Sequence, residues 1–290
     1  MTGAPAAWRD NQFFMRTTIQ TTAVFEGIGL HKGKPARVVF TPAEGPTGLR
    51  FTGPGFAQPL PARVDKVAGT VRGTNITDGK NTIYTVEHLL SAAAGLGIDD
   101  LDIEINGEEP PAADGSALPF AEALRKAGLR EKPAQERRTI SIADTVEFVK
   151  GETSYIASPM PGGLRIKLTY AHPHKLVGSQ TVEFTLRPDD YLKSVAPART
   201  FGFTHELEAL KKAGLGLGGS LDNAVVIAEE EILAKGGLRF PDELARHKLL
   251  DLIGDLALAG APLKDMYIEA VRPGHAGNVN FAKLLLEKAL

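Results

Sequence analysis

Hydrophobic and polar residues alternate over short segments in each half of the chain, and each half then changes to a helical spacing. Alternation with β-branched residues is typical of strands, whereas apolar positions three and four apart are typical of amphipathic helices. Strands are predicted at residues 16–30, 36–40, 101–105, 139–147, 154–157, 164–170, 181–186 and 266–271. Helices are predicted at residues 85–97, 118–127, 204–213, 242–259 and 281–290. Strands followed by helices, seen twice, predict an α+β fold in each half.

The two halves share a sequence pattern and are separated by a polar segment. The run H-L-L-S-A-A-A-G-L-G followed by L-D-I-E-I has a counterpart in H-K-L-L-D-L-I-G-D-L followed by M-Y-I-E-A. Residues 131–138, E-K-P-A-Q-E-R-R, are polar and contain a proline, which is typical of a domain boundary. We therefore predict a flexible leader at 1–14 and two similarly folded α+β domains, each a β-sheet packed with α-helices, at 15–134 and 135–290.

The composition narrows the class of protein. The chain has 290 residues, a net charge of −2 and no cysteine. The charge argues against a general nucleic-acid binder, and the absence of cysteine excludes disulfides, iron–sulfur clusters and thiol catalysis. Charged residues interrupt every apolar stretch before the ~20 residues that a membrane span needs, and the N-terminus lacks a secretory signal pattern. We therefore expect a cytoplasmic protein with no transmembrane segment, in which His, Asp, Glu or backbone oxygens would bind any metal.

Two motifs place a histidine beside a carboxylate on a predicted helix. In H-K-L-L-D, His247 and Asp251 are four residues apart, so they share a helix face and could bind one divalent cation. In T-V-E-H, Glu87 directly precedes His88, so if His88 binds a metal, Glu87 can reach a metal-bound water as a general base. A surface His–Asp pair and a helix N-terminus with a favourable acidic residue explain the same motifs without a metal. Because catalytic zinc takes three protein ligands, His88, His247 and Asp251 form a candidate set.

His275 is a further candidate for a chemical role. It lies in P-G-H-A-G-N, where the glycines leave space around the ring, and it could act as an acid or a cationic stabiliser. Asp255 lies four residues after Asp251 on the same predicted helix face and could raise the pKa of such a histidine. A turn histidine without a role is the alternative.

Two glycine-rich segments have simpler interpretations. The G-x-G-x-x-G match at 214–219 follows a predicted helix and precedes a predicted strand, the reverse of a dinucleotide site, so we interpret it as fortuitous. The turn G-I-G-L-H-K-G-K contains His31 and two lysines, which could contact an anionic group, although a simple solvated turn is the favoured interpretation.

Seven motifs are more specific together than any one of them. They are G-I-G-L-H (27–31), T-V-E-H-L-L (85–90), D-G-S-A (114–117), A-R-T-F-G-F (198–203), L-G-G-S-L-D-N-A (217–224), R-H-K-L-L-D-L-I-G-D-L (246–256) and G-H-A (274–276). In their order and approximate spacing they resemble the UDP-3-O-acyl-N-acetylglucosamine deacetylase family, the zinc amidases of lipid A synthesis. The resemblance runs from about Arg16 to the C-terminus.

The resemblance implies two similarly folded domains with the active site at their interface, and hydrolysis of the N-acetyl group of UDP-3-O-acyl-N-acetylglucosamine with release of acetate. At the matching positions, it implies a Zn²⁺ cofactor bound by His88, His247 and Asp251. The catalytic residues that it implies are Glu87 as general base, His275 with its partner Asp255, and Thr200 beside the oxyanion. The substrate contacts that it implies are Phe201 at the sugar, Lys248 at the diphosphate, and His31, Gly219 and Ser220.

Three positions depart from the family pattern. Ala112 and Ala113 replace bulky apolar residues before D-G-S-A, and Ala171 replaces an acid, so details of substrate contact should differ while the metal set is intact. The alternatives to the family activity are a zinc amidase acting on a different acylated substrate and a non-catalytic binder that kept the fold. A binder should have lost part of the catalytic set, but all five of its members are present: Glu87, His88, His247, Asp251 and His275. We therefore predict a zinc-dependent deacetylase, monomeric, whose partner is a nucleotide-sugar lipid precursor.

Overall fold

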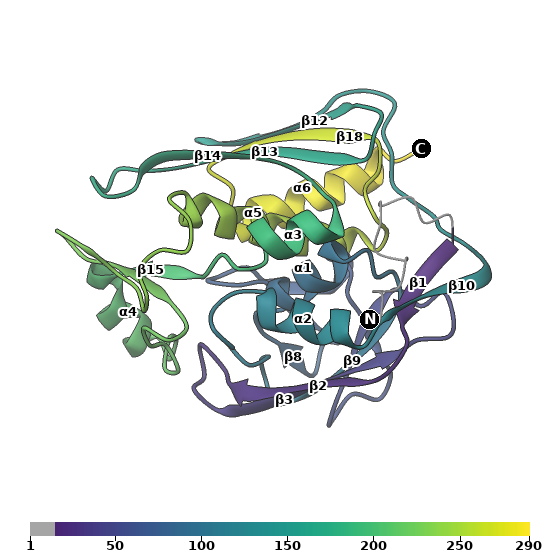
Figure 1. Cartoon of the computed structure of the whole chain (residues 1–290), viewed down its shortest axis with the longest axis horizontal. Helices are drawn as coiled ribbons and strands as arrows, with labels where there is room; N and C mark the ends of the chain where they lie inside the picture. Colours follow the sequence, from purple (N-terminus) through teal and green to yellow (C-terminus); the bar gives the residue numbers. More distant parts are fainter. Residues whose placement is uncertain (1–14) are drawn as a thin grey trace, which may run out of the picture.

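The computed structural model describes residues 15–290, so the predicted leader at 1–14 lies outside the described residues. Two five-stranded sheets form the outer layers, and the longer helices lie between them (Figure 1). The sheet of the first half has the order β2-β3-β9-β4-β5. Its strands are β2 (Ala23–Ile28), β3 (Pro35–Pro42), β4 (Leu49–Thr52), β5 (Leu60–Pro61) and β9 (Leu101–Asn106). The helices of this half are α1 (Glu87–Gly95) and α2 (Leu118–Lys126).

The sheet of the second half has the order β11-β12-β18-β13-β14. Its strands are β11 (Val146–Lys150), β12 (Thr153–Pro159), β13 (Leu164–His172), β14 (Gly178–Thr185) and β18 (Met266–Val271). The helices α5 (Glu243–Leu256) and α6 (His275–Glu287) pack with this sheet, and this half also contains α3 (Pro188–Ser194).

The two sheets have the same topology. In each, the strand that comes last in sequence enters the centre of the sheet, antiparallel to the second strand and parallel to the third. A helix precedes this central strand, α1 before β9 and α5 before β18, and another helix follows it, α2 or α6. The predicted α+β fold with two similar halves is therefore confirmed, since the connectivity repeats as well as the composition of elements.

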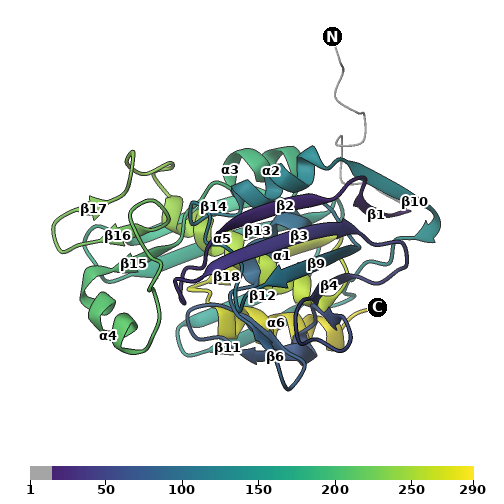
Figure 2. The ribbon, with the colours of Figure 1, turned by 90° about the horizontal axis from the view of Figure 1, so that it is seen from below.

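Each half also contains a small sheet between its fourth strand and the helix before its central strand. In the first half, β6 (Val67–Gly69), β7 (Asn75–Thr77) and β8 (Thr82–Ile83) follow a short 3₁₀ helix at Val64–Lys66. In the second half, β15 (Phe201–Phe203), β16 (Val225–Ile227) and β17 (Ile232–Leu233) form a sheet with α4 (Leu207–Lys212) nearby. Further 3₁₀ turns lie at Thr204–Glu206 and Ala257–Ala259. The sheet β15–β17 and α4 form one end of the molecule (Figure 2).

The two halves meet where α1 packs against α5. Leu89 and Leu90 of α1 and Leu249 and Leu250 of α5 are fully buried in a hydrophobic core that includes both halves. Burial of each such side chain stabilises the fold by roughly 1.5–3 kcal/mol. The approach of the two helices is close, because a Cβ atom added at Gly254 of α5 would lie 2.0 Å from the carbonyl oxygen of Glu87. The absence of a side chain at position 254 therefore brings together the two helices that contain the histidine motifs.

The polar segment 131–138 is not the linker that its composition predicts. Most of it belongs to β10 (Leu129–Glu136), which pairs with β1 (Met15–Ile19). Lys132 is buried, and its Nζ atom lies 2.6 Å from Asp100 Oδ2 and donates to the carbonyl of Ala43. A buried lysine with an acidic partner is indistinguishable in sequence from a solvated one. The predicted domain boundary at 134/135 falls within this strand and stays a prediction.

Three element boundaries also differ from the prediction. The predicted strand 139–147 overlaps only the start of β11, which begins at Val146. The predicted strand 16–30 is divided at residues 20–22 into β1 and β2, which belong to different sheets. The C-terminal helix begins at His275 rather than at 281. Its first turns contain Gly277, which lowers helix propensity, but a Cβ atom there would lie 2.5 Å from the hydroxyl of Tyr155. Close packing on β12 therefore favours a helix that begins before the apolar run.

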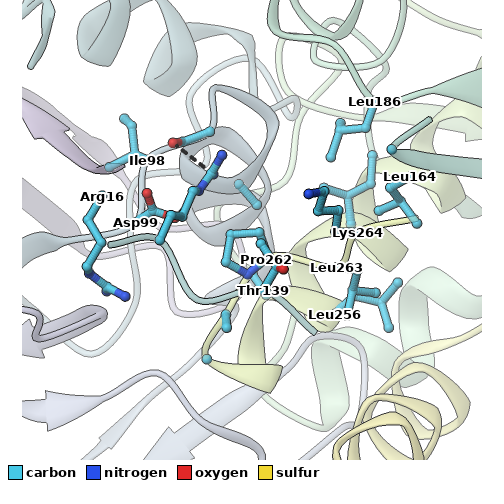
Figure 3. Close-up of a pocket in the computed structure, with 18 of the residues that line it drawn as sticks. Arg16, Ile98, Asp99, Thr139, Leu164, Leu186, Leu256, Pro262, Leu263 and Lys264 are labelled. Carbon is cyan, nitrogen blue, oxygen red and sulfur yellow. Dashed lines mark hydrogen bonds and ion pairs between the residues drawn. The ribbon is translucent and has the colours of Figure 1, made fainter. Parts of the chain in front are cut away.

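A cavity of about 1050 Å³ opens between the halves, and none of the predicted site residues lines it. Figure 3 shows Ile98 and Asp99 on one side and a set of aliphatic side chains on the other, which includes Leu164, Leu186, Leu256 and Leu263. The candidate active site must therefore be located from its functional groups and not from the size of a cavity. In the described part of the chain, no helix combines the length and the hydropathy that crossing a membrane requires.

Candidate active site

The three predicted metal ligands converge where α1 meets α5. His88 is the second residue of α1, and His247 and Asp251 lie one turn apart in α5. The Nε2 atoms of His88 and His247 lie 3.7 and 3.3 Å from Asp251 Oδ1. One ligand atom from each residue falls within 4.8 Å of the others. Side chains about 160 positions apart in sequence are thus directed at one point between the two halves.

The donor set fits a divalent metal ion. Tetrahedral ligands about 2.0–2.2 Å from zinc are separated from each other by about 3.4 Å, close to the separations of Asp251 Oδ1 from the two imidazoles. Asp251 Oδ1 is buried and has no hydrogen-bond partner among residues 15–290. His247 Nδ1 lies 3.1 Å from the carbonyl oxygen of Ala198, which fixes the proton on Nδ1 and directs the lone pair of Nε2 toward Asp251. A buried carboxylate oxygen without a donor, facing two imidazole nitrogens, is the arrangement that a cation would complete.

The charge states of these side chains also favour metal binding. Burial lowers the pKa of His247 to about 3, and burial also lowers the pKa of His88, so both rings are neutral near pH 7. Burial favours the protonated form of Asp251, but the positive charges around it, from His247 when protonated and from Lys248, hold its pKa below the usual range. Lys248 Nζ donates to Asp251 Oδ2 at 2.8 Å. Two neutral imidazoles and an ionised carboxylate are the protonation states that a metal requires.

Glu87 lies beside this cluster but is not one of the three residues that form it. It is buried, and its Oε2 atom accepts a hydrogen bond of 2.9 Å from the backbone amide of Thr74. Burial raises the pKa of Glu87; with the opposing charge of His275 and the charges of Asp255 and Asp251, the result is a pKa of about 7. A second group of atoms within 4.8 Å of one another joins Glu87, Asp251 and His275. Glu87 is therefore within reach of groups bound at the cluster and is poised to exchange a proton near neutral pH.

His275 and Asp255 form a buried ion pair on the other side of Asp251. His275 Nδ1 lies 3.0 Å from Asp255 Oδ2, and His275 Nε2 lies 4.0 Å from Asp251 Oδ2. Burial alone would lower the pKa of His275, but the charge and hydrogen bond of Asp255, with Asp251 and Glu87, raise it to about 9. His275 is therefore protonated at neutral pH, with its Nε2–H directed toward the candidate metal site.

Three of the other predicted site residues border the cluster. Thr200 and His88 line a small cavity, and the backbone amide of Thr200 donates to the carbonyl of Gly115 at 2.8 Å. The ring of Phe201 lies 5.9 Å from that of His247, centroid to centroid. Lys248 Nζ lies 5.3 Å from the centroid of Phe201. An aromatic face and a cation thus flank the same edge of the cluster.

The remaining predicted residues lie in two loops that pack on each other across the interface. His31 Nε2 hydrogen-bonds the carbonyl of Arg72 at 3.1 Å, and the amide of Gly216 donates to His31 Nδ1 at 3.3 Å. Both ring nitrogens are thus engaged with backbone, and burial lowers the pKa of His31. Gly219 donates to the carbonyl of Gly216, and the amide of Ser220 donates to Asn223. These residues belong to the contact between the two halves. None of them contributes an atom to the cluster of candidate metal ligands.

Several supporting residues were not predicted. Asp255 also accepts hydrogen bonds from Thr74 Oγ1, at 2.5 Å, and from Asn278 Nδ2, at 2.8 Å. Asn278 lies three residues after His275 on α6, a helical spacing that could have indicated it once the helix start was known. Thr74 has no such signal, because it lies 13 positions from Glu87 and 181 from Asp255.

A buried ion pair fixes the segment that contacts His247. Glu243, the first residue of α5, accepts hydrogen bonds from the amide and the Nε atom of Arg199, at 3.1 and 2.8 Å. Arg199 lies between Ala198, whose carbonyl orients His247, and Thr200. Breaking a buried pair of this kind typically costs about 3–5 kcal/mol. The pair therefore fixes the segment 198–200 against the helix that contains His247 and Asp251.

The fold and the site together are typical of metal-dependent hydrolases. Two α+β halves have a His-His-Asp set between them, with a buried carboxylate on one side of this set and a charged histidine on the other. The chain belongs to the UDP-3-O-acyl N-acetylglycosamine deacetylase family, whose model matches residues 16–287.

Similar proteins support this assignment over nearly the whole chain. A UDP-3-O-acyl-N-acetylglucosamine deacetylase of Anaeromyxobacter sp. (strain Fw109-5) is 40% identical over 274 residues, which cover 94% of this chain and 89% of the relative. That of Nitratidesulfovibrio vulgaris is 41% identical over 277 residues, 94% of this chain and 88% of the relative. That of Myxococcus xanthus is 38% identical over 267 residues, 91% of this chain and 84% of the relative. The family resemblance found from the motifs is therefore confirmed.

Proposed function

We propose that this chain hydrolyses the N-acetyl group of UDP-3-O-acyl-N-acetylglucosamine, releasing acetate, as a zinc-dependent deacetylase of lipid A biosynthesis. The observation that supports it best is the buried Oδ1 atom of Asp251, which has no hydrogen-bond partner within residues 15–290 and faces two neutral imidazoles in a chain of the deacetylase family. Beside it stand a carboxyl group with a raised pKa and a charged histidine. Amide hydrolysis needs a metal site, a general base and a proton donor together.

The donor set favours Zn²⁺ as the cofactor. Two imidazole nitrogens with one carboxylate oxygen are a ligand set suited to zinc, whereas magnesium and calcium prefer oxygen alone. His88, His247 and Asp251 would hold the ion and leave a fourth position open. When bound there, zinc supplies Lewis acidity, which polarises the amide carbonyl and acidifies water.

The proton transfers belong to residues of this chain. Glu87 takes a proton from the water whose oxygen attacks the acetyl carbonyl carbon. His275, held by Asp255, donates a proton to the amide nitrogen as the C–N bond breaks, so that the amino sugar and acetate are the products. Thr200 donates a hydrogen bond to the carbonyl oxygen as its charge develops. The raised pKa of His275, about 9, keeps the donor charged at neutral pH, and Glu87, with a pKa of about 7, is ionised in a large fraction of molecules.

The border of the cluster supplies substrate contacts. Phe201 offers an aromatic face for the apolar side of the sugar ring, and Lys248 a cation for the diphosphate. His31, Gly219 and Ser220 would contact the substrate from the loops beside the cluster. Ala112, one of the departures from the family pattern, lines the small cavity with His88 and Thr200. A smaller side chain at this wall leaves more space beside the cluster than a bulky one would.

Release of acetate from UDP-3-O-acyl-N-acetylglucosamine by the zinc-loaded chain tests the proposal. Two controls make the test specific: the Asp251→Ala variant, which lacks one ligand, and UDP-N-acetylglucosamine, which lacks the acyl chain. We expect acetate only with the intact protein and the acylated substrate. Full zinc content without acetate release would refute the assignment. The cytoplasmic location and the monomeric state remain predictions from the sequence.

A further inference from the structure

One buried residue of the first half hydrogen-bonds two carboxylates of the candidate site. Thr74 lies immediately before β7 and is fully buried. Its backbone amide donates to Glu87 Oε2 at 2.9 Å, and its hydroxyl donates to Asp255 Oδ1 at 2.5 Å. Glu87 is on α1 of the first half, whereas Asp255 is on α5 of the second. Thr74 thus hydrogen-bonds both Glu87, the proposed proton acceptor, and Asp255, the partner of the proposed proton donor His275.

We propose that Thr74 is a positioning residue for the reaction, which holds Glu87 and the Asp255–His275 pair in a fixed relation across the interface between the halves. This inference rests on the proposed function, because it assigns Thr74 a part in the same proton transfers. Thr74 acts through Glu87 and Asp255 and needs no contact with the substrate. General acid–base catalysis depends on such placement, because a proton moves efficiently only over hydrogen-bond distances.

The backbone around Thr74 is held tightly enough for this role. Its carbonyl accepts a hydrogen bond of 3.0 Å from the amide of Val86, the residue before α1. The amide of Thr85 donates to the side chain of Asn75 at 3.1 Å. A Cβ atom at Gly73 would lie 3.2 Å from Glu87 Oε1, so the strand segment also approaches the carboxylate closely. The amide of Thr74 therefore cannot move without displacing the start of α1.

The hydroxyl has a role at Asp255 that no other described donor shares. Asp255 Oδ2 accepts from His275 Nδ1 at 3.0 Å and from Asn278 Nδ2 at 2.8 Å, both on α6. Within residues 15–290, Thr74 is the only side chain that donates a hydrogen bond to Asp255 Oδ1. Asp255 is fully buried, so loss of the hydroxyl would leave a carboxylate oxygen without a partner. The carboxylate would then rotate toward another donor, and the imidazole of His275 would move with it.

Two substitutions separate the hydroxyl from the shape of the side chain. Thr74→Val keeps the volume and the backbone amide but removes the hydroxyl, whereas Thr74→Ser keeps the hydroxyl. We expect Thr74→Val to lower kcat about 10- to 100-fold, the range expected for a hydrogen bond to a charged group, with KM changed less than about twofold. Zinc content should stay full in both variants, and Thr74→Ser should recover most of kcat.

A matched control lies three residues further along the chain, at the end of β7. Thr77 donates its hydroxyl to the carbonyl of Asn81 at 2.6 Å, in a turn at the end of β7 away from the cluster. Thr77→Val therefore removes a hydroxyl of similar geometry without touching either carboxylate. We expect its kcat to match that of the unsubstituted protein, even if its melting temperature falls as far as that of Thr74→Val.

A second measurement is independent of activity. The side-chain amide of Asn278 and the imidazole of His275 donate to the same oxygen of Asp255, so their NMR signals report the orientation of the carboxylate. Both signals should shift in Thr74→Val and keep their positions in Thr74→Ser and Thr77→Val. If the unsubstituted protein releases no acetate, the proposed function fails and the NMR result alone decides the role of Thr74. Unchanged kcat in Thr74→Val, or unchanged NMR signals, would overturn the inference.

Discussion

Asp251 Oδ1 lies 3.3 Å from the Nε2 atom of His247, one helical turn earlier on α5, and, although buried, accepts no hydrogen bond from any residue of the described part of the chain. An unsatisfied buried acceptor typically costs about 1–3 kcal/mol, and more when it is charged. The two side chains share a helix face because they are four residues apart. The cost is offset once a cation occupies the point between them, so local stability and metal binding are linked.

Removal of a ligand should remove the metal. We expect His247→Ala to lose most of its zinc, because the variant retains only two of the three proposed ligands. His205→Ala, which changes an exposed histidine outside the cluster, should keep a full complement. Metal content per chain, measured by mass spectrometry after dialysis, distinguishes the two. Stoichiometric zinc in His247→Ala would show that the ion binds elsewhere.

Loss of the general base should leave the metal in place. Glu87→Gln keeps an oxygen that can accept from the amide of Thr74 but cannot take up a proton at neutral pH. We expect turnover to fall about 10²- to 10⁴-fold, with zinc content unchanged. Parallel measurement of kcat and metal content checks this. Should Glu87→Gln lose zinc as readily as His247→Ala, Glu87 would be a ligand, and His275 would be the next candidate for the base.

The pH–rate profile should be bell-shaped. Glu87 must be ionised, so activity rises with pH through its pKa, which is about 7 without a metal and lower when a divalent cation lies nearby. His275 must be protonated, so activity falls as pH rises through its pKa, which is about 9 without a metal and lower when a divalent cation lies nearby. We expect His275→Ala to have low activity and to lose the alkaline limb. An alkaline limb that persists unchanged in this variant would assign that ionisation to another group.

The same ion pair should make stability depend on pH. Asp255 and its neighbours raise the pKa of His275 to about 9 from its ordinary value near 6.5. The stabilisation is therefore fully present below about pH 6.5 and is lost as pH rises through 9. Melting temperatures of the metal-free protein and of metal-free His275→Ala should converge over this range. A difference between them that is as large at pH 10 as at pH 6 would contradict the pairing.

Gly254→Ala tests whether helix contact sets the geometry of the site. Alanine favours a helix by about 1 kcal/mol over glycine, yet its Cβ atom would lie 2.0 Å from the carbonyl oxygen of Glu87. The clash should separate α1 from α5, lowering both the melting temperature and the affinity for zinc. Gly45→Ala is the control, since a Cβ atom there meets only Thr47, at 3.4 Å. Tighter zinc binding in Gly254→Ala than in the control would refute this account.

Much of this protein follows from its sequence because the signals are local. The alternation in L-D-I-E-I and the spacing of His247, Asp251 and Asp255 depend only on the periods of strands and helices, and the structure contains the corresponding elements, β9 and α5. The order of strands and helices in each half likewise predicted the α+β class. The seven motifs predicted the family, which the comparisons confirm.

Contacts between distant segments were decided by the tertiary structure. The polar segment 131–138 became a strand because Asp100 neutralises the buried Lys132, and the helix of His275 began early because Gly277 packs on Tyr155. The convergence of His88 with His247 and Asp251 was implied by the family resemblance, but its physical cause is the close approach of α1 and α5. Thr74 could not be identified at all, since its two carboxylate partners are set by packing across the interface between the halves. Local pattern determines which side chains share a face, whereas only the packed core determines which faces meet.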